Sequence, residues 1–343
     1  MARSTVAEKL TAQALAGPPL RDPVAVAKRL LAVQGQDPRG ARLAVRARTV
    51  GVSAADVDRA LTDDRSLLIT WLNRGTLHLV ASEDYPLLQA LTTPPLRTSC
   101  TRRLRQEGVA EEEAERAMKL TEKVLGGEGP LSGKDLRERL VAAGIPAAGQ
   151  AFLHLMFLAA VRGLVVRGPM IGRQHAYALV DDWLGPQRPV DRDAALAELA
   201  HRYLVGHAPA NDRDLARWAG LPLRDARAGL AAISRRLRQR DDGLLELKKQ
   251  PPAAALPPPR LLGAFDPLLL GWTSREDVLG GATGIVTING IFRPFALVKG
   301  RAEATWGLAG GKVTIKPFDR LTKKAAAALE ADAEAVVEFM GIE

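Results

Sequence analysis

The chain has 343 residues, a formal net charge of +9 and one cysteine, Cys100. Its length suits two to four modules, and the single cysteine excludes an intramolecular disulfide and argues against a cysteine-based zinc site. Because no apolar run approaches the ~18 residues of a membrane span and the start lacks a signal-peptide core, we expect a cytoplasmic, nucleoid-associated protein without membrane contact.

The basic residues make nucleic acid the first choice of partner. Of 48 lysines and arginines, 36 are arginines, whose planar fork suits bidentate contacts to phosphates and bases. A GC-rich genome would also favour arginine codons. The excess of positive charge nevertheless favours a polyanionic partner over a generic basic protein.

The first hundred residues predict three helices, at 5–15, 22–33 and 53–61, and then strands at 67–72 and 76–80. In the second helix, an aspartate is the expected N-cap and the proline after it the first helical residue. Three helices followed by a two-stranded ribbon is the order of a winged helix.

Two neutral amides, Gln34 and Gln36, follow the second of these helices. Pro38 disfavours helix at Asp37, and Gly35 has no helix preference, so we expect an extended segment here. Residues i and i+2 of an extended segment point to the same face, so both carboxamides can reach one small molecule, such as water. The alternative is that the two glutamines only cap carbonyl groups or face solvent.

The same order of elements recurs twice downstream. Helices at 111–125, 132–143 and 150–162 precede strands at 164–167 and 177–180. A third set has helices at 193–204, 211–219 and 224–238, followed by a weak strand at 244–247. The sequence therefore predicts three winged-helix modules in tandem.

A proline-rich linker at 250–259 separates these modules from a strand-rich end. The expected elements there are strands at 285–288, 295–299, 302–308 and 312–316 and a helix at 322–339. We predict an α+β protein with winged helices at 1–100, 101–188 and 189–250 in a C shape, and a small C-terminal β-domain at 251–343.

Several blocks of the sequence together resemble the tandem winged-helix DNA glycosylases. They are Gln34-Gly35-Gln36-Asp37-Pro38-Arg39 with the basic run that follows it, Arg74-Gly75-Thr76-Leu77-His78-Leu79-Val80, Phe265-Asp266-Pro267-Leu268-Leu269-Leu270-Gly271-Trp272 and Gly290-Ile291-Phe292-Arg293-Pro294. Glutamine at both amide positions resembles the AlkZ-like, azinomycin-resistance branch, whereas a housekeeping branch has Gln-x-Asp. The blocks span residues 30 to 320 in the expected order.

The resemblance implies a monofunctional DNA glycosylase without cofactor or metal. Its substrate would be double-stranded DNA with bulky N7-alkylguanine adducts or interstrand crosslinks, and its role base excision repair and self-resistance to a DNA-alkylating antibiotic. It also implies a channel around duplex DNA, a C-terminal hairpin that probes the minor groove, and Gln34 and Gln36 as catalytic residues. We expect a monomer, since a C-shaped channel needs no second copy.

The chemistry of the residues agrees with this expectation. Glutamine does not titrate and cannot act as a general base, but a guanine alkylated at N7 is already a cationic leaving group. Positioning a water with oriented amides can then be sufficient. Asp37 is a competing candidate, because a carboxylate would stabilise an oxocarbenium ion better, but it points to the opposite face of an extended segment and we prefer a structural role for it.

The candidate DNA contacts are basic or lie in the expected hairpin. Their alternatives are a solvated basic surface for the arginines and core packing for Phe292. We expect His78 and His154 to be core residues, and we predict no metal site because no cluster has metal-ligand spacing. The candidates are Arg39, Arg42, Arg46, Arg48, Arg74, Ile291, Phe292 and Arg293.

Two non-catalytic functions compete with the glycosylase. Winged helices often bind DNA without altering it, so a transcriptional regulator or an architectural DNA-binding protein is the first alternative. A catalytically inactive partner protein is the second. The amide pair and the β-domain blocks favour the enzyme, because a regulator needs neither.

Overall fold

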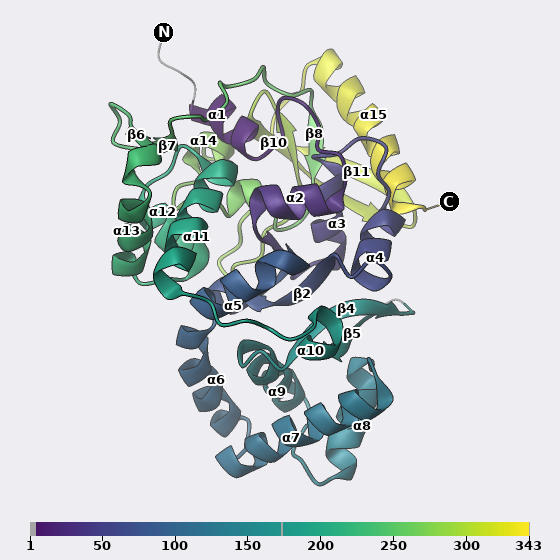
Figure 1. Cartoon of the computed structure of the whole chain (residues 1–343). Coiled ribbons are helices and arrows are strands. Elements are labelled where there is room, and N and C mark those ends of the chain that lie inside the picture. Colours follow the sequence, from purple (N-terminus) through teal and green to yellow (C-terminus); the bar gives the residue numbers. More distant parts are fainter. Residues whose placement is uncertain (1–4, 173, 343) are drawn as a thin grey trace. The chain divides into compact units, whose positions relative to one another are not determined.

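The computed structural model in Figure 1 describes residues 5–172 and 174–342. Contacts between Cα atoms divide the chain into two compact units. The first contains residues up to Val57 and from Asp193 onward, and the second runs from Asp58 to Arg192. Both units mix helices and strands, so the predicted α+β class is confirmed. The division into four segments at residues 100, 188 and 250 stays a prediction.

The second unit contains an antiparallel sheet in the order β3-β2-β4-β5. Leu67 of β2 pairs with Ala81 of β3, and the register continues to Leu72 opposite Thr76. Two predicted strand pairs are therefore joined edge to edge in one sheet. The strands are β2 (Leu67–Leu72), β3 (Thr76–Ala81), β4 (Val165–Ile171) and β5 (Gln174–Leu179).

Helices of the second unit enclose an apolar core. The three predicted helices are confirmed as α7, α8 and α9, which lie close together in Figure 1, and Ser132 caps α8 with its hydroxyl. Trp71 of β2 packs edge-on against Phe157 of α9, with ring centroids 5.9 Å apart. The helices are α5 (Tyr85–Thr92), α6 (Pro94–Gln106), α7 (Glu111–Glu128), α8 (Gly133–Ala142), α9 (Gln150–Val161) and α10 (Val180–Leu184).

The first unit contains a helical part. Figure 1 shows α11, α12 and α13 standing together beside the ribbon of β6 and β7. The helices of this unit are α1 (Thr5–Ala12), α2 (Pro23–Leu30), α3 (Pro38–Arg46), α11 (Arg192–His207), α12 (Asp212–Ala219) and α13 (Leu223–Ala232), and α4 (Ala54–Thr62) crosses the division between the units.

One helix of the third predicted module is shorter than expected. The helix predicted to reach residue 238 ends at Ala232 as α13, and Leu237–Gln239 forms strand β6 opposite β7 (Leu245–Leu247). Residues 234–238 contain only one apolar residue, Leu237, whereas a helix packed on the core would need an apolar face. Pairing of Leu237 with Leu247 therefore decides its conformation.

A four-stranded antiparallel sheet in the order β11-β10-β9-β8 completes the first unit. Trp306 of β10 is buried and donates its Nε1 hydrogen to the carbonyl of Leu262, which joins two strands that are not neighbours. The predicted strand at 285–288 is instead one arm of a short hairpin. The elements are β8 (Arg260–Leu262), β9 (Phe295–Val298), β10 (Arg301–Ala309), β11 (Lys312–Pro317), α14 (Glu276–Leu279) and α15 (Lys323–Met340).

Asp-Pro pairs begin three helical segments. Asp22 caps α2 as predicted, and its Oδ1 accepts from the amide of Ala25 at 2.7 Å. Asp37 caps α3 in the same way, and Asp266 caps a short 3-10 helix at Pro267–Leu269. The prediction missed α3 because it treated Pro38 only as a helix breaker, whereas proline is favoured as the first helical residue.

A completely buried ion pair connects α3 to the C-terminal part of the first unit. The guanidinium of Arg48 bonds both carboxylate oxygens of Asp266, at 2.9 and 3.0 Å, and neither side chain is exposed. Its remaining bonds go to the carbonyls of Gln13 and Ala44 and to the side chain of Gln13. All five N–H groups are thus satisfied, which a buried charge requires.

We expect Asp266→Ala to lower the free energy of unfolding by about 3 to 5 kcal/mol, because it leaves the Arg48 charge buried and unpaired. Urea unfolding followed by circular dichroism measures this. Glu111→Ala, which breaks an exposed pair with Arg105, is the matched control and should cost under about 1 kcal/mol. Equal losses in the two variants would contradict the central role of the buried pair.

Two buried histidines predict a dependence of stability on pH. Burial lowers the pKa of His78 and of His207 to about 3, well below the usual value of 6.5. The unfolded chain then binds more protons between these values, so stability is complete above pH 6.5 and falls as the pH drops towards 3. Each histidine contributes a slope of up to about 1.4 kcal/mol per pH unit.

Replacing His207 by glutamine should therefore flatten the decline of the unfolding free energy between pH 6.5 and 4.5. Urea titrations at several pH values measure the slope, and His154→Gln, at a partly exposed ring, is the control. A wild-type slope retained in the His207 variant would show that this ring is protonated in the folded state.

Candidate active site

The amide motif lies between α2 and α3 in the first unit. Leu31 ends α2 with a φ of +64°, which turns the chain out of the helix, and Val33 and Gln34 form the short strand β1. The segment is thus extended at Gln34, as predicted, and becomes helical again from Pro38.

The two amides differ in burial. Gln34 is 6% exposed, whereas Gln36 is exposed to solvent. The Oε1 atom of Gln34 is buried and accepts no hydrogen bond from any described residue. A buried acceptor without a donor costs about 1 to 3 kcal/mol, which a ligand or a water that donates to it would recover. A ligand that contacts both amides therefore has to reach from Gln36 at the surface to the buried Oε1 of Gln34.

Asp37 is occupied at the N-terminus of α3. Its Oδ1 accepts from the backbone amides of Arg39 at 2.9 Å and Gly40 at 3.0 Å. These bonds satisfy two of the free N–H groups that begin every helix, and the carboxylate also stabilises the positive end of the helix dipole. The side chain therefore has a structural role in this position.

Gly40 allows α3 to lie directly on the chain around Ala264. A Cβ atom at Gly40 would stand 2.3 Å from the carbonyl oxygen of Ala264, closer than any side chain can approach. Gly263 also lies close to this helix, since a Cβ there would be 3.0 Å from the Cα of Gly40. The sequence analysis missed these two glycines; a glycine inside the first turn of a capped helix was the available signal.

Of the four arginines that follow the motif, Arg39 is exposed. Its guanidinium donates to the carbonyl of Leu308 on β10 at 3.1 Å. Arg42 is 7% exposed and donates to the carbonyl of Pro38.

The structure assigns the other two arginines to the interior. Arg46 pairs with Asp332 of α15 at 2.5 Å and is 9% exposed, and Arg48 is the buried partner of Asp266. The sequence analysis placed both at DNA because their charge alone does not reveal acidic partners that lie 286 and 218 residues away in the chain. We correct both to structural residues that hold α3.

A hairpin over residues 285–293 carries three of the predicted DNA contacts. The amide of Arg293 bonds the carbonyl of Ile285, and the amide of Thr287 bonds the carbonyl of Ile291. Ile291 is 52% exposed and Arg293 is exposed, and Ile288, which was not predicted, is fully exposed at the tip. These side chains are accessible to a partner.

Phe292 belongs to the core of the first unit. It is 8% exposed and packs beside Phe265, with ring centroids 5.7 Å apart, while the guanidinium of Arg275 lies over its ring. Of the two alternatives for this residue, a wedge into DNA or core packing, the structure shows packing.

A groove of about 430 Å³ lies along β10 and β11. Arg39 bonds Leu308, a lining residue, so the groove begins beside the amide motif. Its other lining residues include Arg293 and Lys316 but no carboxylate. A polyanion would be favoured here electrostatically.

The remaining site candidate, Arg74, belongs to the second unit. It is exposed on the turn between β2 and β3. Cys100, in the same unit, is buried, and burial raises the pKa of its thiol to about 12, so it is no nucleophile at neutral pH.

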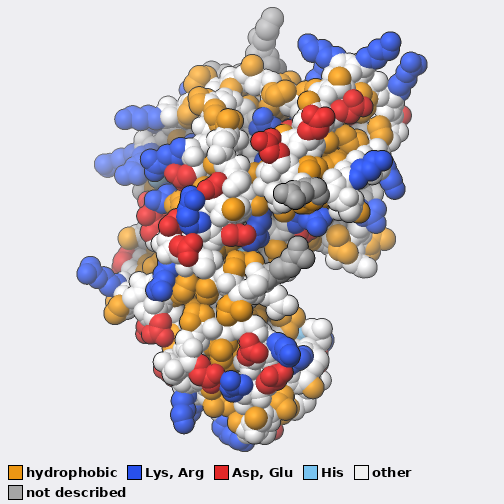
Figure 2. Space-filling model, turned by 90° about the vertical axis from the view of Figure 1, so that its right-hand side faces the viewer, with side chains coloured by type: hydrophobic (Ala, Val, Ile, Leu, Met, Phe, Trp, Pro, Cys, Tyr) orange, Lys and Arg blue, Asp and Glu red, His pale blue; other side chains and the backbone are white. Residues whose placement is uncertain are grey.

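Among the described residues, no group of three or more metal-ligating side chains lies together. The same part of the chain contains no helix with the length and hydropathy of a membrane span. On the face shown in Figure 2, lysine and arginine side chains stand in groups, with acidic side chains among them. The charge of the molecule is thus unevenly distributed over this surface.

Comparison with known proteins defines the class of protein. A solved structure, the Streptomyces sahachiroi DNA glycosylase AlkZ, superposes with a TM-score of 0.81 and 24% sequence identity, over 99% of this chain and 96% of that one, so the two share a fold. A curated relative from the same organism, named interstrand DNA cross-link repair glycosylase, is 26% identical over 92% of this chain and 90% of its own length. Both of these similar proteins are named glycosylases.

The profile described as "DNA glycosylase AlkZ-like" matches residues 27–339. The chain belongs to this family of DNA glycosylases, as its sequence motifs predicted. The match includes the amide motif, the buried Asp266 and the hairpin. A regulator without catalytic activity is therefore set aside.

We expect Asp37→Ala to destabilise the protein by about 1 kcal/mol through loss of the N-cap, and Asp37→Asn to be nearly neutral, because asparagine caps equally well. Thermal unfolding measures both variants. If Asp37 were instead a catalytic carboxylate, the asparagine variant would lose base release while keeping wild-type stability.

Proposed function

We propose that this glycosylase hydrolyses the N-glycosidic bond of bulky N7-alkylguanine, in monoadducts or in interstrand crosslinks. The observation that carries the proposal is the unpartnered buried Oε1 of Gln34 beside the exposed Gln36. The name of the curated relative, a cross-link repair glycosylase, supports the substrate class. The role that follows is base excision repair, as self-resistance to a DNA-alkylating antibiotic.

In the proposed reaction, water attacks C1′ while the C1′–N9 bond breaks. The bonding electrons move into the cationic guanine, which leaves as a neutral alkylated base, and the water becomes the hydroxyl of an abasic sugar. Gln34 accepts a hydrogen bond from this water through Oε1, and Gln36 orients it from the surface. The proton leaves to solvent after the bond has formed, since no glutamine can take it.

Neutral residues suit this reaction because the substrate supplies the charge. Alkylation at N7 weakens the bond before the enzyme acts, so stabilising and orienting the water can provide the remaining rate enhancement. The same site is poorly equipped for an undamaged base, whose departure would need an acid. Selectivity for cationic lesions thus follows because neither Gln34 nor Gln36 can donate or take up a full proton.

DNA contacts in this proposal come from exposed residues of both units. Arg293 lines the groove along β10 and β11, and Arg39 bonds Leu308, another residue of its lining. Ile291 lies on the hairpin, and Arg74 lies on the turn between β2 and β3. A crosslinked base cannot easily be flipped, and aromatic residues form only 4% of the chain. We infer that the damaged base stays in the stack and that the hairpin enters the minor groove.

We infer three tandem winged-helix modules and a C-terminal β-domain. The order of α7, α8 and α9 before β4 and β5, and of α11, α12 and α13 before β6 and β7, supports two of these modules. We infer that the protein acts as a monomer on double-stranded DNA in the cytoplasm, at the nucleoid. Arg42, which is nearly buried, would support the motif through its bond to Pro38.

The decisive experiment is base release from duplexes that carry N7-methylguanine, a bulky guanine adduct or an azinomycin-type crosslink. We expect Gln36→Ala and Gln34→Met to reduce the single-turnover rate at least about 100-fold each, as loss of an oriented polar group in an active site does. The methionine variant keeps the volume of the buried side chain, so its stability should change little.

Gln187→Ala is the matched control, since it removes an exposed glutamine of the second unit and should release base at the wild-type rate. Base release that persists in the Gln34→Met, Gln36→Ala double variant would overturn the catalytic assignment. A wild-type protein that releases no base from any of these substrates would support the inactive-partner alternative.

A further inference from the structure

The ribbon of β6 and β7 carries unequal charges along its length. Arg238 lies directly opposite Glu246 in the register, and the two form an ion pair. Two steps further along the ladder, beyond the pair of Leu237 and Leu247, the amide of Lys248 bonds the carbonyl of Arg236 at 2.8 Å. An opposite-charge pair is thus followed by two like charges across the strands.

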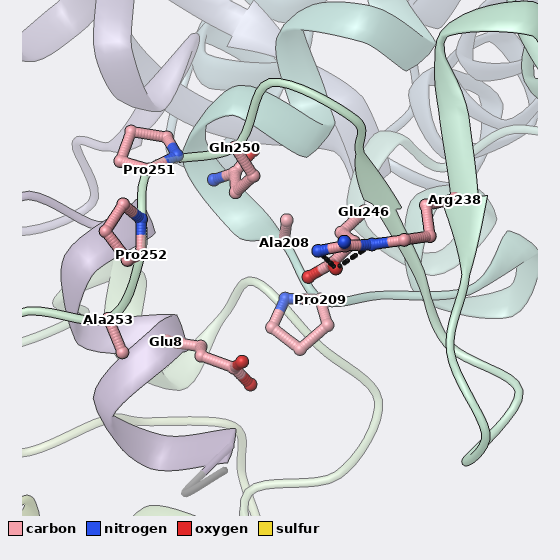
Figure 3. A pocket seen from close by; sticks show the side chains of 9 residues that line it. All are labelled: Glu8, Ala208, Pro209, Arg238, Glu246, Gln250, Pro251, Pro252 and Ala253. Atoms are coloured by element: carbon pink, nitrogen blue, oxygen red, sulfur yellow. Dashed lines mark hydrogen bonds and ion pairs between the residues drawn. The ribbon is translucent and has the colours of Figure 1, made fainter.

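The acidic residues near the ribbon are already bound. Figure 3 shows Arg238 and Glu246 joined at a cavity of about 100 Å³, with Glu8 of α1 turned towards it. Glu8 and Asp242 both pair with Arg240, and Glu246 lies 3.9 Å from the same guanidinium. These three carboxylates are therefore already bound to arginines, and Asp241, the other acidic residue of the ribbon, lies in the turn between β6 and β7.

Four cations at the other end of the ribbon form what we call the wing-base patch: Arg235, Arg236, Lys248 and Lys249. All four are exposed, and none forms an ion pair with a described residue. Like charges directly opposite each other on neighbouring strands destabilise a sheet. Segment 211–250 contains ten basic and six acidic residues. The four residues of the patch therefore account for the whole excess of positive charge in this segment.

We propose that the wing-base patch binds phosphates of the DNA backbone, as a contact separate from the amide motif. The inference rests on the proposed action on duplex DNA. Guanidinium and ammonium groups without acidic partners suit phosphates, and the patch residues are all charged, which disfavours an apolar protein surface as the partner. The contact carries no sequence or lesion preference, because phosphates are alike in every duplex.

The test is the salt dependence of binding to an undamaged duplex of about 30 base pairs. Replacing all four patch residues by glutamine should reduce the slope of log K against log salt by about 3 to 4, near 0.9 for each lost phosphate contact. Affinity at 100 mM salt should fall by about 10- to 100-fold. Thermal unfolding should be unchanged or improved, since repulsion is removed.

The matched control replaces four exposed lysines elsewhere, Lys119, Lys123, Lys323 and Lys324, by glutamine and so changes the net charge equally. It should alter the slope by less than about 1. An unchanged slope in the patch variant, or an equal change in the control, would overturn the proposal. Binding of the patch to polyglutamate with an unchanged DNA slope would assign it to an acidic peptide instead.

Base release separates this proposal from the proposed function. At saturating enzyme, the patch variant should release alkylated guanine at the wild-type rate, because the patch contains no residue of the amide motif. A slower rate at saturation would overturn the separation of the two contacts. A wild-type protein that releases no base but shows the expected slope difference would refute the glycosylase substrate and leave the patch in place.

Discussion

The buried pair of Arg48 and Asp266 is the interaction on which the first unit depends. It joins the end of α3 to a segment more than 200 residues further along the chain, and Gln13 connects it to α1. A buried ion pair adds little stability over an apolar core of the same shape, but it permits one arrangement only, because any displacement leaves a charge unpaired. The pair therefore specifies where α3 lies.

The amide motif takes its position from that helix. Asp37 caps its first turn, Gly40 lets its backbone rest on Ala264, and Arg46 ties its last turn to α15. Gln34 and Gln36 thus precede a helix that is held at both ends, although neither glutamine has a strong anchor of its own. A reaction that depends on orienting one water needs such rigidity, since small displacements of an oriented group weaken its effect on the rate.

Charge is used in two ways in this basic chain. Two of the arginines near the motif, Arg46 and Arg48, form ion pairs inside the protein. They stabilise the position of α3 and do not contribute to DNA affinity. The exposed cations stand elsewhere, in the groove along β10 and β11 and in the wing-base patch. This separation allows DNA affinity to arise from the periphery, while the motif itself stays neutral and suited to a cationic base.

The sequence by itself determined the α+β class and most helices and strands, because these depend on local periodicity. It also determined the N-caps at Asp22 and Ser132 and the family, because these depend on single capping residues and on short motifs. Only the tertiary structure decided which charges are buried. Arg48 and Arg39 look alike in the sequence, but one meets Asp266 across the core and the other meets solvent. The end of α13 and the burial of Phe292 were likewise decided by distant partners, Leu247 and Phe265. Each of these partners lies outside the helix or strand whose position it decides, so no pattern within that element encodes the pairing.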